Sequence, residues 1–423
     1  MKDLFGNGMQ QREFKPVTIQ QMNKFGLKKE NVKITNTIKE LKETTPNIVI
    51  ADCVFNISFV QNWFKKQYLK KKHKYVMGLG VFQQLHYDTL HKIQILKPSN
   101  LKFKNIYKPY EGQDLTNKTI LFSRTGGVGD LLFLNPILKH LKQKYPTCTI
   151  WFGCGPQYQS MLDNWPFIDK ILDLPFDFQY LIKADYHAIF EGVIERCKEA
   201  EETNAYNLFS KWLGFDLSDD ILVPKQEPKE EKVKECEKII EDWGLEKDSF
   251  ILMQLRASSP IRTPSIEFWI KMINEITNKG YNIVITDNPK QSDIIKGFIK
   301  ELDNQDKVFN FSKHSQSLDY SIALTSLAKC VVATDSALIH IAISESVKAF
   351  GIYGPFPGKI RLKTYPKNLC DWIDAPGFEC TPCFKHGSEP CPRANGKMFA
   401  PCYDTIDIKN VVEKIEKLIE KGK

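Results

Sequence analysis

The chain has 423 residues, too many for one ordinary core, so its length predicts two or three domains. Its hydrophobic content of 42% is typical of a soluble globular protein. The sequence contains no run of about 18 uncharged apolar residues, so we expect no transmembrane helix. The N-terminus lacks the apolar core of a secretion signal, so we expect a cytoplasmic protein.

The positive charge is concentrated near the N-terminus. Residues 1–115 contain 20 Lys and Arg against 9 Asp and Glu, a net charge of +11, so the remaining residues sum to −3. The densest stretch, 64–75, reads FKKQYLKKKHKY and could contact an anionic surface: nucleic acid, lipid headgroups or an anionic glycan. The alternative is a solvated lysine-rich helix face. We interpret 1–115 as a basic N-terminal extension or added domain, containing one strand at 47–55.

Strands and helices alternate from residue 116 onward. KTILFS is a predicted buried strand, followed by a helix from Asp130 and by strands at 147–155, 168–175 and 186–192. This alternation predicts a parallel sheet covered on both faces, with ligand-binding loops at the carboxyl ends of the strands. We expect a first α/β domain over 116–222.

A charged, proline-containing stretch at 216–235 predicts a linker running into a helix, after which the alternation restarts. Predicted strands and helices follow through 249–258, 266–280, 281–289, 306–312, 318–330, 331–346 and 347–355. The second α/β domain is therefore expected over 223–423.

The turn TGGVGD connects the first strand of this pattern to its helix. It matches neither the dinucleotide fingerprint G-x-G-x-x-G nor the phosphate loop G-x-x-x-x-G-K-[ST]. Gly126, Gly127 and Gly129 allow positive φ and a close approach of the backbone to a ligand. Asp130 follows in the first turn of the helix, where it acts either in chemistry or as a helix N-cap.

The segment CVVATDSALIH predicts an anion site. A buried strand ends in Thr334, Asp335 and Ser336, and the helix that begins near Ala337 presents free backbone amides suited to a diphosphate. His340 lies one turn into that helix, on the side of Ser336. It is either a buried core histidine or a ligand contact.

The loop QLRASSPIR follows another strand and offers guanidinium and hydroxyl groups to phosphate oxygens: Arg256, Ser258, Ser259 and Arg262. A surface loop with ordinary basic residues is the alternative. The later Gly- and Pro-rich loop at 351–361 brings Lys359 and Arg361 within reach of the same cleft.

Four of the eleven cysteines are clustered in the segment 380–402. Cys380, Cys383, Cys391 and Cys402 form the pattern C-x2-C-x7-C-x10-C, which can provide four thiolates to a structural zinc ion. His386 lies inside the cluster as a possible substitute ligand. The other cysteines are scattered and are interpreted as core residues or free thiols.

Two of these motifs, taken in order, resemble the heptosyltransferase family, glycosyltransferase family nine. The N-terminal motif is GGVGDLLFLNPILKHLKQKYP, and the C-terminal one is TDSALIHIAISESVKAFGIYGPFP. The resemblance covers residues 116–405. It implies the glycosyltransferase-B fold of two facing Rossmann-like domains, here preceded by the basic extension.

The resemblance further implies inverting, metal-independent transfer of a heptose-like sugar from a nucleotide-diphosphate-sugar, the co-substrate, to a glycan or other hydroxyl acceptor. Asp130 would be the general base, and Gly126, Gly127 and Gly129 would leave room for the acceptor. No further cofactor is implied for catalysis. A lipid-linked acceptor of the lipopolysaccharide type would bring the protein to a membrane as a peripheral enzyme.

On the donor side, the resemblance implies that amides of residues 335–337 bind the diphosphate, with His340 nearby. Arg256 or Arg262 would neutralise the leaving group, although the usual family lysine is absent from this loop. Asp287 would contact the ribose. Alternatives are a nucleotide-sugar epimerase or hydrolase on the same fold, or a non-catalytic protein that binds glycan or nucleic acid.

Overall fold

The computed structural model describes residues 110–124, 127–173, 180, 183–190, 193–194, 198–385 and 390–421, together with four short strands nearer the N-terminus. These strands are β1 (Val32–Thr35), β2 (Ile48–Ile50), β3 (Tyr75–Met77) and β4 (Ile93–Leu96), and they form a parallel sheet in the order β1-β4-β2-β3. The strand predicted at 47–55 is described as β2 alone. Residues 64–74, most of the predicted basic stretch, lie outside the described residues.

The next sheet is the one predicted from the alternation that begins at residue 116. Its strands are β5 (Thr119–Ser123), β6 (Thr149–Cys154), β7 (Lys170–Asp173) and β8 (Tyr186–Ile189), all parallel in the order β7-β6-β5-β8. Ile120 and Phe122 of β5 and Ile150 and Phe152 of β6 are fully buried. Leu121, which lies between Ile120 and Phe122, is also buried, so β5 is covered on both faces, as expected for an inner strand of a parallel sheet.

The helices of this part of the chain follow β5, β6 and β8 in sequence. They are α5 (Val128–Lys144), α6 (Gln159–Leu162) and α8 (Ala205–Trp212), with the 3-10 turns η4 (Pro156–Tyr158) and η5 (Lys198–Glu201). Leu131, Leu134, Leu138 and Leu141, which recur at helical spacing along α5, are all buried.

A six-stranded parallel sheet occupies the C-terminal half in the order β11-β10-β9-β12-β13-β14. Its strands are β9 (Phe250–Gln254), β10 (Asn282–Ile285), β11 (Val308–Asn310), β12 (Cys330–Thr334), β13 (Lys348–Tyr353) and β14 (Cys370–Asp374). All five residues of β12 are buried, because this strand lies inside the sheet and is covered on both faces. The linker predicted at 216–235 ends in a helix, α9 (Glu230–Glu241).

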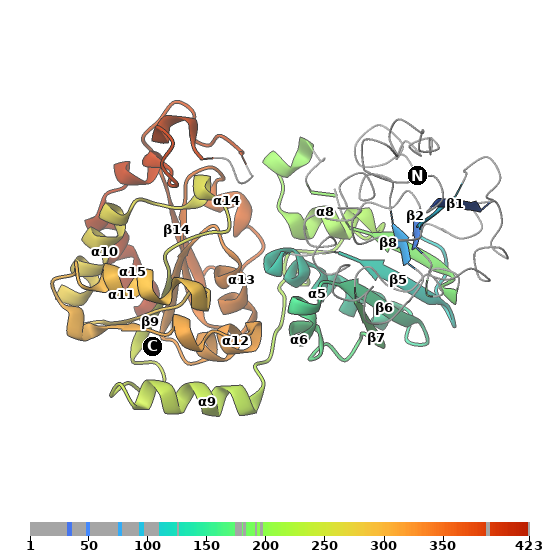
Figure 1. Ribbon diagram of the computed structural model, residues 1–423, viewed down its shortest axis with the longest axis horizontal. Helices are drawn as coiled ribbons and strands as arrows, with labels where there is room; N and C mark the ends of the chain where they lie inside the picture. Colours follow the sequence, from blue (N-terminus) through green and yellow to red (C-terminus); the bar gives the residue numbers. More distant parts are fainter. Residues whose placement is uncertain are drawn as a thin grey trace. The chain divides into compact units, whose positions relative to one another are not determined.

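Helices cover both faces of this sheet (Figure 1). One face packs against α10 (Ile266–Asn278), α11 (Ser292–Ile299) and α15 (Ile408–Glu420). The other carries α12 (Leu318–Ser326) and α13 (Ala337–Ser344), while the short α14 (Gly358–Arg361) follows β13. The Ser265 side chain caps α10 by accepting a hydrogen bond from the Phe268 amide, as its position before an apolar helix favours.

Short 3-10 turns complete the described secondary structure of this half. They are η6 (Pro260–Arg262), η7 (Pro289–Gln291), η8 (Gln305–Lys307), η9 (Ser312–His314), η10 (Pro392–Ala394) and η11 (Pro401–Thr405). Both β14 and α15 lie beyond the last element predicted from the sequence. Within the part of the chain that is described, no helix combines the length and apolarity needed to cross a bilayer.

The chain divides into two compact units. The first contains Met1–Gly126, Ile137–Ala200 and Asn207–Asp216, and the second contains Gly127–Pro136, Glu201–Tyr206 and Leu217–Lys423. The first turns of α5 therefore belong to the second unit, and the division within α5 falls at Pro136, which removes a backbone donor from the helix. The domain boundaries expected at 115/116 and 222/223 stay predictions.

Candidate functional site

The carboxyl end of β12 and the start of α13 form the centre of the candidate site. The predicted strand-to-helix junction is present: β12 ends at Thr334, and α13 begins at Ala337. The buried carboxylate of Asp335 lies between two guanidinium groups: Arg262 Nη1 is 3.4 Å and Arg361 Nη2 is 3.5 Å from its Oδ2. Arg262 Nη1 also donates to the backbone carbonyl of Asp335 at 2.9 Å. The sequence motif and both arginines are thus brought together.

The cluster of Asp335, Arg262 and Arg361 carries more positive than negative charge, and several of its polar atoms lack a hydrogen-bond partner among the described residues. Two guanidinium groups face one carboxylate. Among the described residues, four buried atoms here have no hydrogen-bond partner: Arg262 Nε, Arg361 Nε, Thr334 Oγ1 and Ser336 Oγ. An unpaired buried donor costs about 1–3 kcal/mol, so such a group is usually explained by a missing partner. Together with the free amides at the start of α13, these groups fit an anion with several oxygens.

Two serines of the preceding loop have different positions. Ser258 Oγ accepts a hydrogen bond from Arg262 Nη2 at 2.9 Å and so orients that guanidinium. Ser259 is buried, and its carbonyl accepts from Thr263 Oγ1 at 3.0 Å. Thr263 Oγ1 in turn accepts from the Ala257 amide at 3.2 Å. These bonds hold the loop in the shape that places Arg262 beside Asp335.

Arg256 and Asp287, predicted as separate donor contacts, form a two-bond ion pair. Arg256 Nε donates to Asp287 Oδ2 at 2.9 Å, and Arg256 Nη2 donates to Oδ1 at 3.0 Å. The pair joins the loops that follow β9 and β10. Each of the two groups already has a charged partner. To contact the leaving group and the ribose as predicted, Arg256 and Asp287 would have to bond to the ligand and to each other at the same time.

His340 is buried on α13, and its Nδ1 lies 2.6 Å from the hydroxyl oxygen of Tyr365. The rings of Phe133 and Tyr365 pack against it edge to face, at centroid distances of 4.9 and 5.7 Å. Desolvation lowers the pKa of His340 to about 4; Arg361 and Arg262 lower it as well, and Asp335 opposes them. The imidazole is therefore neutral at physiological pH.

The glycine turn before α5 brings Asp130 beside Gly127. Gly127 has φ of +85°, as the sequence predicted for a glycine of this turn, and Gly126 lies outside the described residues. The alternative interpretation of Asp130 as the N-cap is wrong, because α5 begins two residues earlier, at Val128. Asp130 is instead the third helical residue, in the turn that faces the start of α13: a Cβ on Gly129 would lie 3.6 Å from His340 Cδ2.

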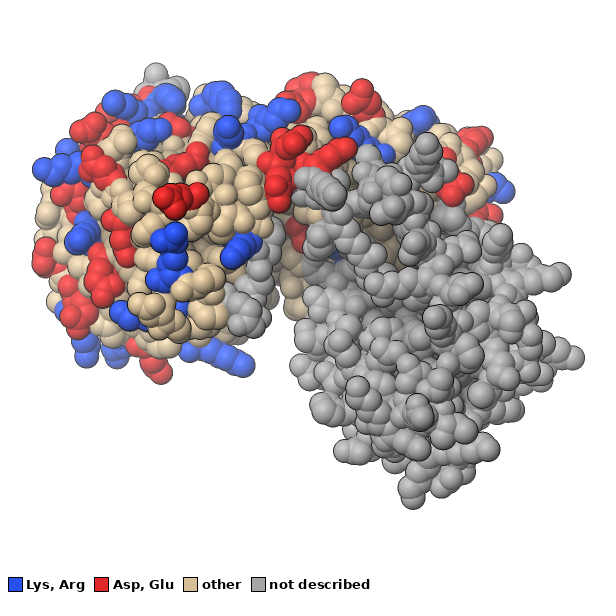
Figure 2. All heavy atoms as spheres, turned by 90° about the horizontal axis from the view of Figure 1, so that it is seen from above, with Lys and Arg blue, Asp and Glu red and all other residues tan. Residues whose placement is uncertain are grey.

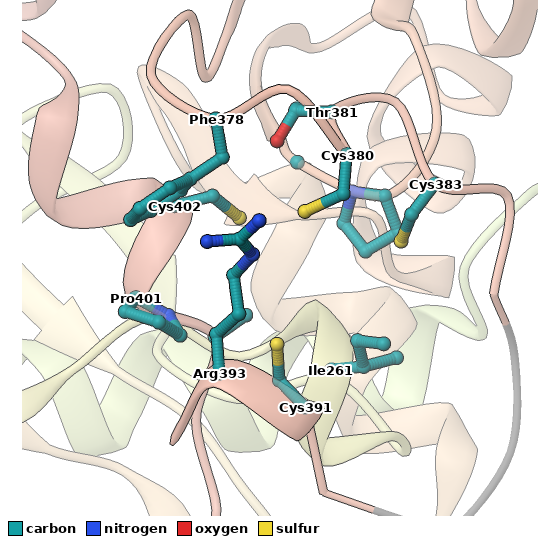
Figure 3. A pocket seen from close by; sticks show the side chains of 12 residues that line it. Ile261, Phe378, Cys380, Thr381, Cys383, Cys391, Arg393, Pro401 and Cys402 are labelled. Atoms are coloured by element: carbon teal, nitrogen blue, oxygen red, sulfur yellow. The ribbon is translucent and has the colours of Figure 1, made fainter. Parts of the chain in front are cut away.

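The four clustered cysteines line one pocket, together with the side chain of Arg393. In Figure 3 the sulfur atoms of Cys380, Cys391 and Cys402 point toward the space that the Arg393 guanidinium enters. Burial, and then the thiols of Cys391, Cys383 and Cys380, raises the pKa of Cys402 to about 12. As the side chains stand, no three Cys, His, Asp or Glu residues of the described chain form a group that could hold a metal ion. His386 lies outside that part of the chain.

Sequence reasoning left two groups of functional candidates unassigned. The sequence places Arg361 within reach of the cleft. It does not predict that Arg361 contacts Asp335, because this contact depends on the path of the loop after β13. Tyr365 and its partner Tyr206 lie in segments with no motif of their own. Their buried aromatic character was a possible signal, but the sequence does not show that their hydroxyls meet.

The face shown in Figure 2 carries acidic and basic side chains in mixture over the described residues. This distribution agrees with the near balance of charge from residue 116 onward. On this face the described basic side chains do not form a continuous patch, and the candidate anion site is defined by its local arginines and buried donors.

Comparisons with known proteins bear on the family and the fold of this chain. Residues 203–390 match the model of glycosyltransferase family 9 (heptosyltransferase), which confirms the predicted resemblance. No curated protein sequence matches the chain.

Solved structures show the same fold. A family 9 glycosyltransferase from Veillonella parvula is 16% identical with a TM-score of 0.55, covering 73% of this chain and 99% of its own. The ADP-heptose LPS heptosyltransferase II of E. coli is 14% identical with a TM-score of 0.54, covering 71% and 98%. The iron-containing dodecameric glycosyltransferase TibC of enterotoxigenic E. coli is 13% identical with a TM-score of 0.50, covering 73% and 78%. These likenesses confirm the predicted glycosyltransferase-B fold.

Proposed function

We propose that this chain, whose residues 203–390 match the model of glycosyltransferase family 9, transfers a sugar from a nucleoside-diphosphate sugar to a hydroxyl acceptor. The observation that carries the proposal is the cluster at the start of α13. Arg262 and Arg361 surround Asp335 there, and buried donors of both arginines and of Ser336 lack a partner among the described residues. A diphosphate supplies the oxygens that these donors require.

In the proposed reaction the two arginines stabilise the leaving group. The bond between the anomeric carbon and the diphosphate oxygen breaks, and that oxygen takes the bonding electron pair. Negative charge therefore grows on the diphosphate in the transition state. Arg262 and Arg361, held in place by Asp335, meet that charge with fixed guanidinium donors. Because these groups supply the positive charge, we propose that the transfer requires no divalent cation.

Asp130 acts on the acceptor in this proposal. Its carboxylate takes the proton from the acceptor hydroxyl as the oxygen attacks the anomeric carbon on the face opposite the diphosphate, which inverts the configuration. The position of Asp130 supports this role. It follows Gly129, whose Cβ would lie 4.0 Å from the Ala337 Cα at the start of α13. General base and donor site are thus neighbours in one compact unit.

The donor and acceptor are proposed from the similar structures. One of them is named an ADP-heptose LPS heptosyltransferase. We propose an ADP-linked, heptose-like sugar as the donor and a glycan of the lipopolysaccharide type as the acceptor. A lipid-linked acceptor would bring this chain to the cytoplasmic face of a membrane, with residues 64–75 as the candidate anionic contact.

The test is a thermal-shift and calorimetric panel of ADP-, UDP-, GDP- and CMP-linked sugars. Ligand binding to the native state raises the melting temperature, so one nucleotide class should stabilise the protein. Arg393→Ala, which removes an exposed arginine of the cysteine pocket, is the matched control and should respond like the wild type. If no nucleotide sugar in the panel binds, the donor proposal is wrong.

We also propose that the four cysteines hold a structural metal ion. Cys380, Cys383, Cys391 and Cys402 line a common pocket, and a set of thiolates selects zinc or iron. That one similar structure is described as iron-containing supports the idea. Binding would draw the sulfurs closer together than they stand here, and the Arg393 guanidinium would leave the space between them.

Metal analysis of the purified protein tests this second proposal. We expect about one equivalent of zinc or iron, lost in Cys380→Ser and retained in Cys148→Ser, which changes a buried cysteine of the other unit. A content below about half an equivalent of either metal would contradict it.

A further inference from the structure

Three buried polar side chains form a chain of hydrogen bonds behind the anion site. His340 Nδ1 lies 2.6 Å from the Tyr365 hydroxyl oxygen, which also contacts the Tyr206 hydroxyl. The exposed fractions are 4% for His340, 2% for Tyr365 and 0% for Tyr206, so water does not replace any of these bonds. All three residues belong to the second compact unit.

The protons of this chain can be assigned by counting donors and acceptors. Among the described residues, the Tyr206 hydroxyl has one polar partner, the oxygen of Tyr365. A buried hydroxyl that donates to nothing costs about 1–3 kcal/mol, so Tyr206 donates to Tyr365. The proton of Tyr365 then has one acceptor left, the Nδ1 of His340. An Nδ1 that accepts carries no hydrogen, so a neutral ring carries its hydrogen on Nε2.

We infer that the Tyr365 hydroxyl fixes His340 as the Nε2–H tautomer and so makes it an uncharged hydrogen-bond donor to the diphosphate. Tyr365 is then a positioning residue for the donor site. This inference rests on the proposed function for the identity of the ligand, but the tautomer is a property of the protein without ligand.

The surroundings of the ring support a donor role. Nε2 is bonded to Cδ2, the ring atom that a Cβ on Gly129 in the first turn of α5 would approach to 3.6 Å. Phe133 fixes the ring plane by packing at an interplanar angle of 85°. The charged groups that influence His340 are Asp335, Arg361 and Arg262, the same groups that form the anion site. A neutral N–H beside two arginines adds a directed donor without adding a third positive charge.

The decisive measurement is ¹⁵N NMR of histidine-labelled protein without ligand, between pH 5.5 and 8, with the His340 signals assigned through His340→Gln. The wild type should show a single tautomer with Nδ1 unprotonated and Nε2 protonated across this range. A protonated Nδ1 in the wild type would overturn the inference whether or not the protein binds nucleotide sugars.

Two tyrosine variants separate the role of Tyr365 from mere packing. Tyr365→Phe removes the donor to Nδ1, so a second tautomer should appear. Tyr206→Phe leaves Tyr365 with His340 as its one described acceptor, so the Nε2–H tautomer should persist. Tyr353→Phe is a further control, since its fully buried hydroxyl has no partner among the described residues. If Tyr365→Phe retains one Nε2–H tautomer, Tyr365 does not fix it.

Calorimetry with ADP links the tautomer to the donor site. Tyr365→Phe should weaken ADP binding about two- to tenfold, the effect of losing one correctly oriented hydrogen bond, while Tyr353→Phe binds as the wild type does. Equal ADP affinity in Tyr365→Phe, with the tautomer released, would show that His340 does not donate to the diphosphate. If the wild type binds UDP-, GDP- or CMP-linked nucleotides instead, the same comparison is made with that nucleotide.

Discussion

The carboxylate of Asp130 lies against the Cα of Gly127: a Cβ on residue 127 would be 2.5 Å from Asp130 Oδ2. The left-handed φ of +85° at Gly127 adds a second obstacle to any side chain there. The glycine turn thus sets the position of the proposed base.

Gly127→Ala should therefore reduce both stability and transfer. The unfavourable φ costs about 1–3 kcal/mol, and the methyl group must displace the Asp130 carboxylate. Denaturant unfolding and initial transfer rates check this. Gly129→Ala is the matched control: it lies in the helix, and its new Cβ would meet His340 Cδ2 at an ordinary 3.6 Å, so stability should not fall. Equal stability losses in both variants would contradict the explanation.

Asp130→Asn tests the base itself. Asparagine keeps the shape of the side chain and removes its ability to take a proton. Transfer should fall by a factor on the order of a hundred or more, while the affinity for the donor measured by calorimetry stays near that of the wild type. Near-normal turnover in this variant would remove Asp130 from its proposed role.

Arg361→Ala and Arg262→Ala should both weaken binding of the nucleotide diphosphate by about tenfold or more, because charge-assisted hydrogen bonds are worth about 1.5–3 kcal/mol each. Isothermal calorimetry with the nucleotide that stabilises the wild type measures the change. Arg393→Ala controls for the loss of one positive charge. The double variant tests coupling: the two arginines share Asp335, so their effects should not add. Unchanged affinity in Arg361→Ala would exclude it from the site.

Glu345, which follows α13, gives a prediction about pH. Its two carboxyl oxygens are buried and lack a hydrogen-bond partner among the described residues, and burial raises its pKa well above the ordinary 4.5. The folded state keeps a proton that the unfolded chain releases above about pH 4.5, so this group lowers stability as the pH rises past that value.

Glu345→Gln removes this pH-dependent loss of stability while keeping the shape of the side chain. The melting temperature at pH 7 should rise by about 2 °C or more, and the gain should shrink toward pH 4. Glu413→Gln, an exposed position of α15, is the control and should show no such pH dependence. A gain that is the same at both pH values would show that ionisation of Glu345 is not its cause.

The sequence predicted the elements whose signals are local. The apolar run of β12, followed by small residues that start α13, identified Thr334, Asp335 and Ser336 correctly as a strand-to-helix junction. The pairing of Arg256 with Asp287 could not be predicted, because it depends on β9 and β10 being neighbours in the sheet. The Tyr365 contact with His340 likewise joins residues from separate loops and helices. The sequence predicts Asp130 in the first helical turn, but it predicts the helix start two residues after Val128, because element ends are the least reliable part of a prediction from one sequence.

All strand pairs among the described residues are parallel, and this topology affects how the protein folds. Parallel neighbours cannot be joined by a tight hairpin, so each pairing closes a long loop before it gains any stability. At the centre of the larger sheet, Ile251 of β9 pairs with Cys330 of β12. During synthesis, β9 therefore stays exposed on that edge until β12 has left the ribosome, and the anion site at the end of β12 forms late. We expect slow refolding and a tendency to aggregate for fragments that end before residue 330.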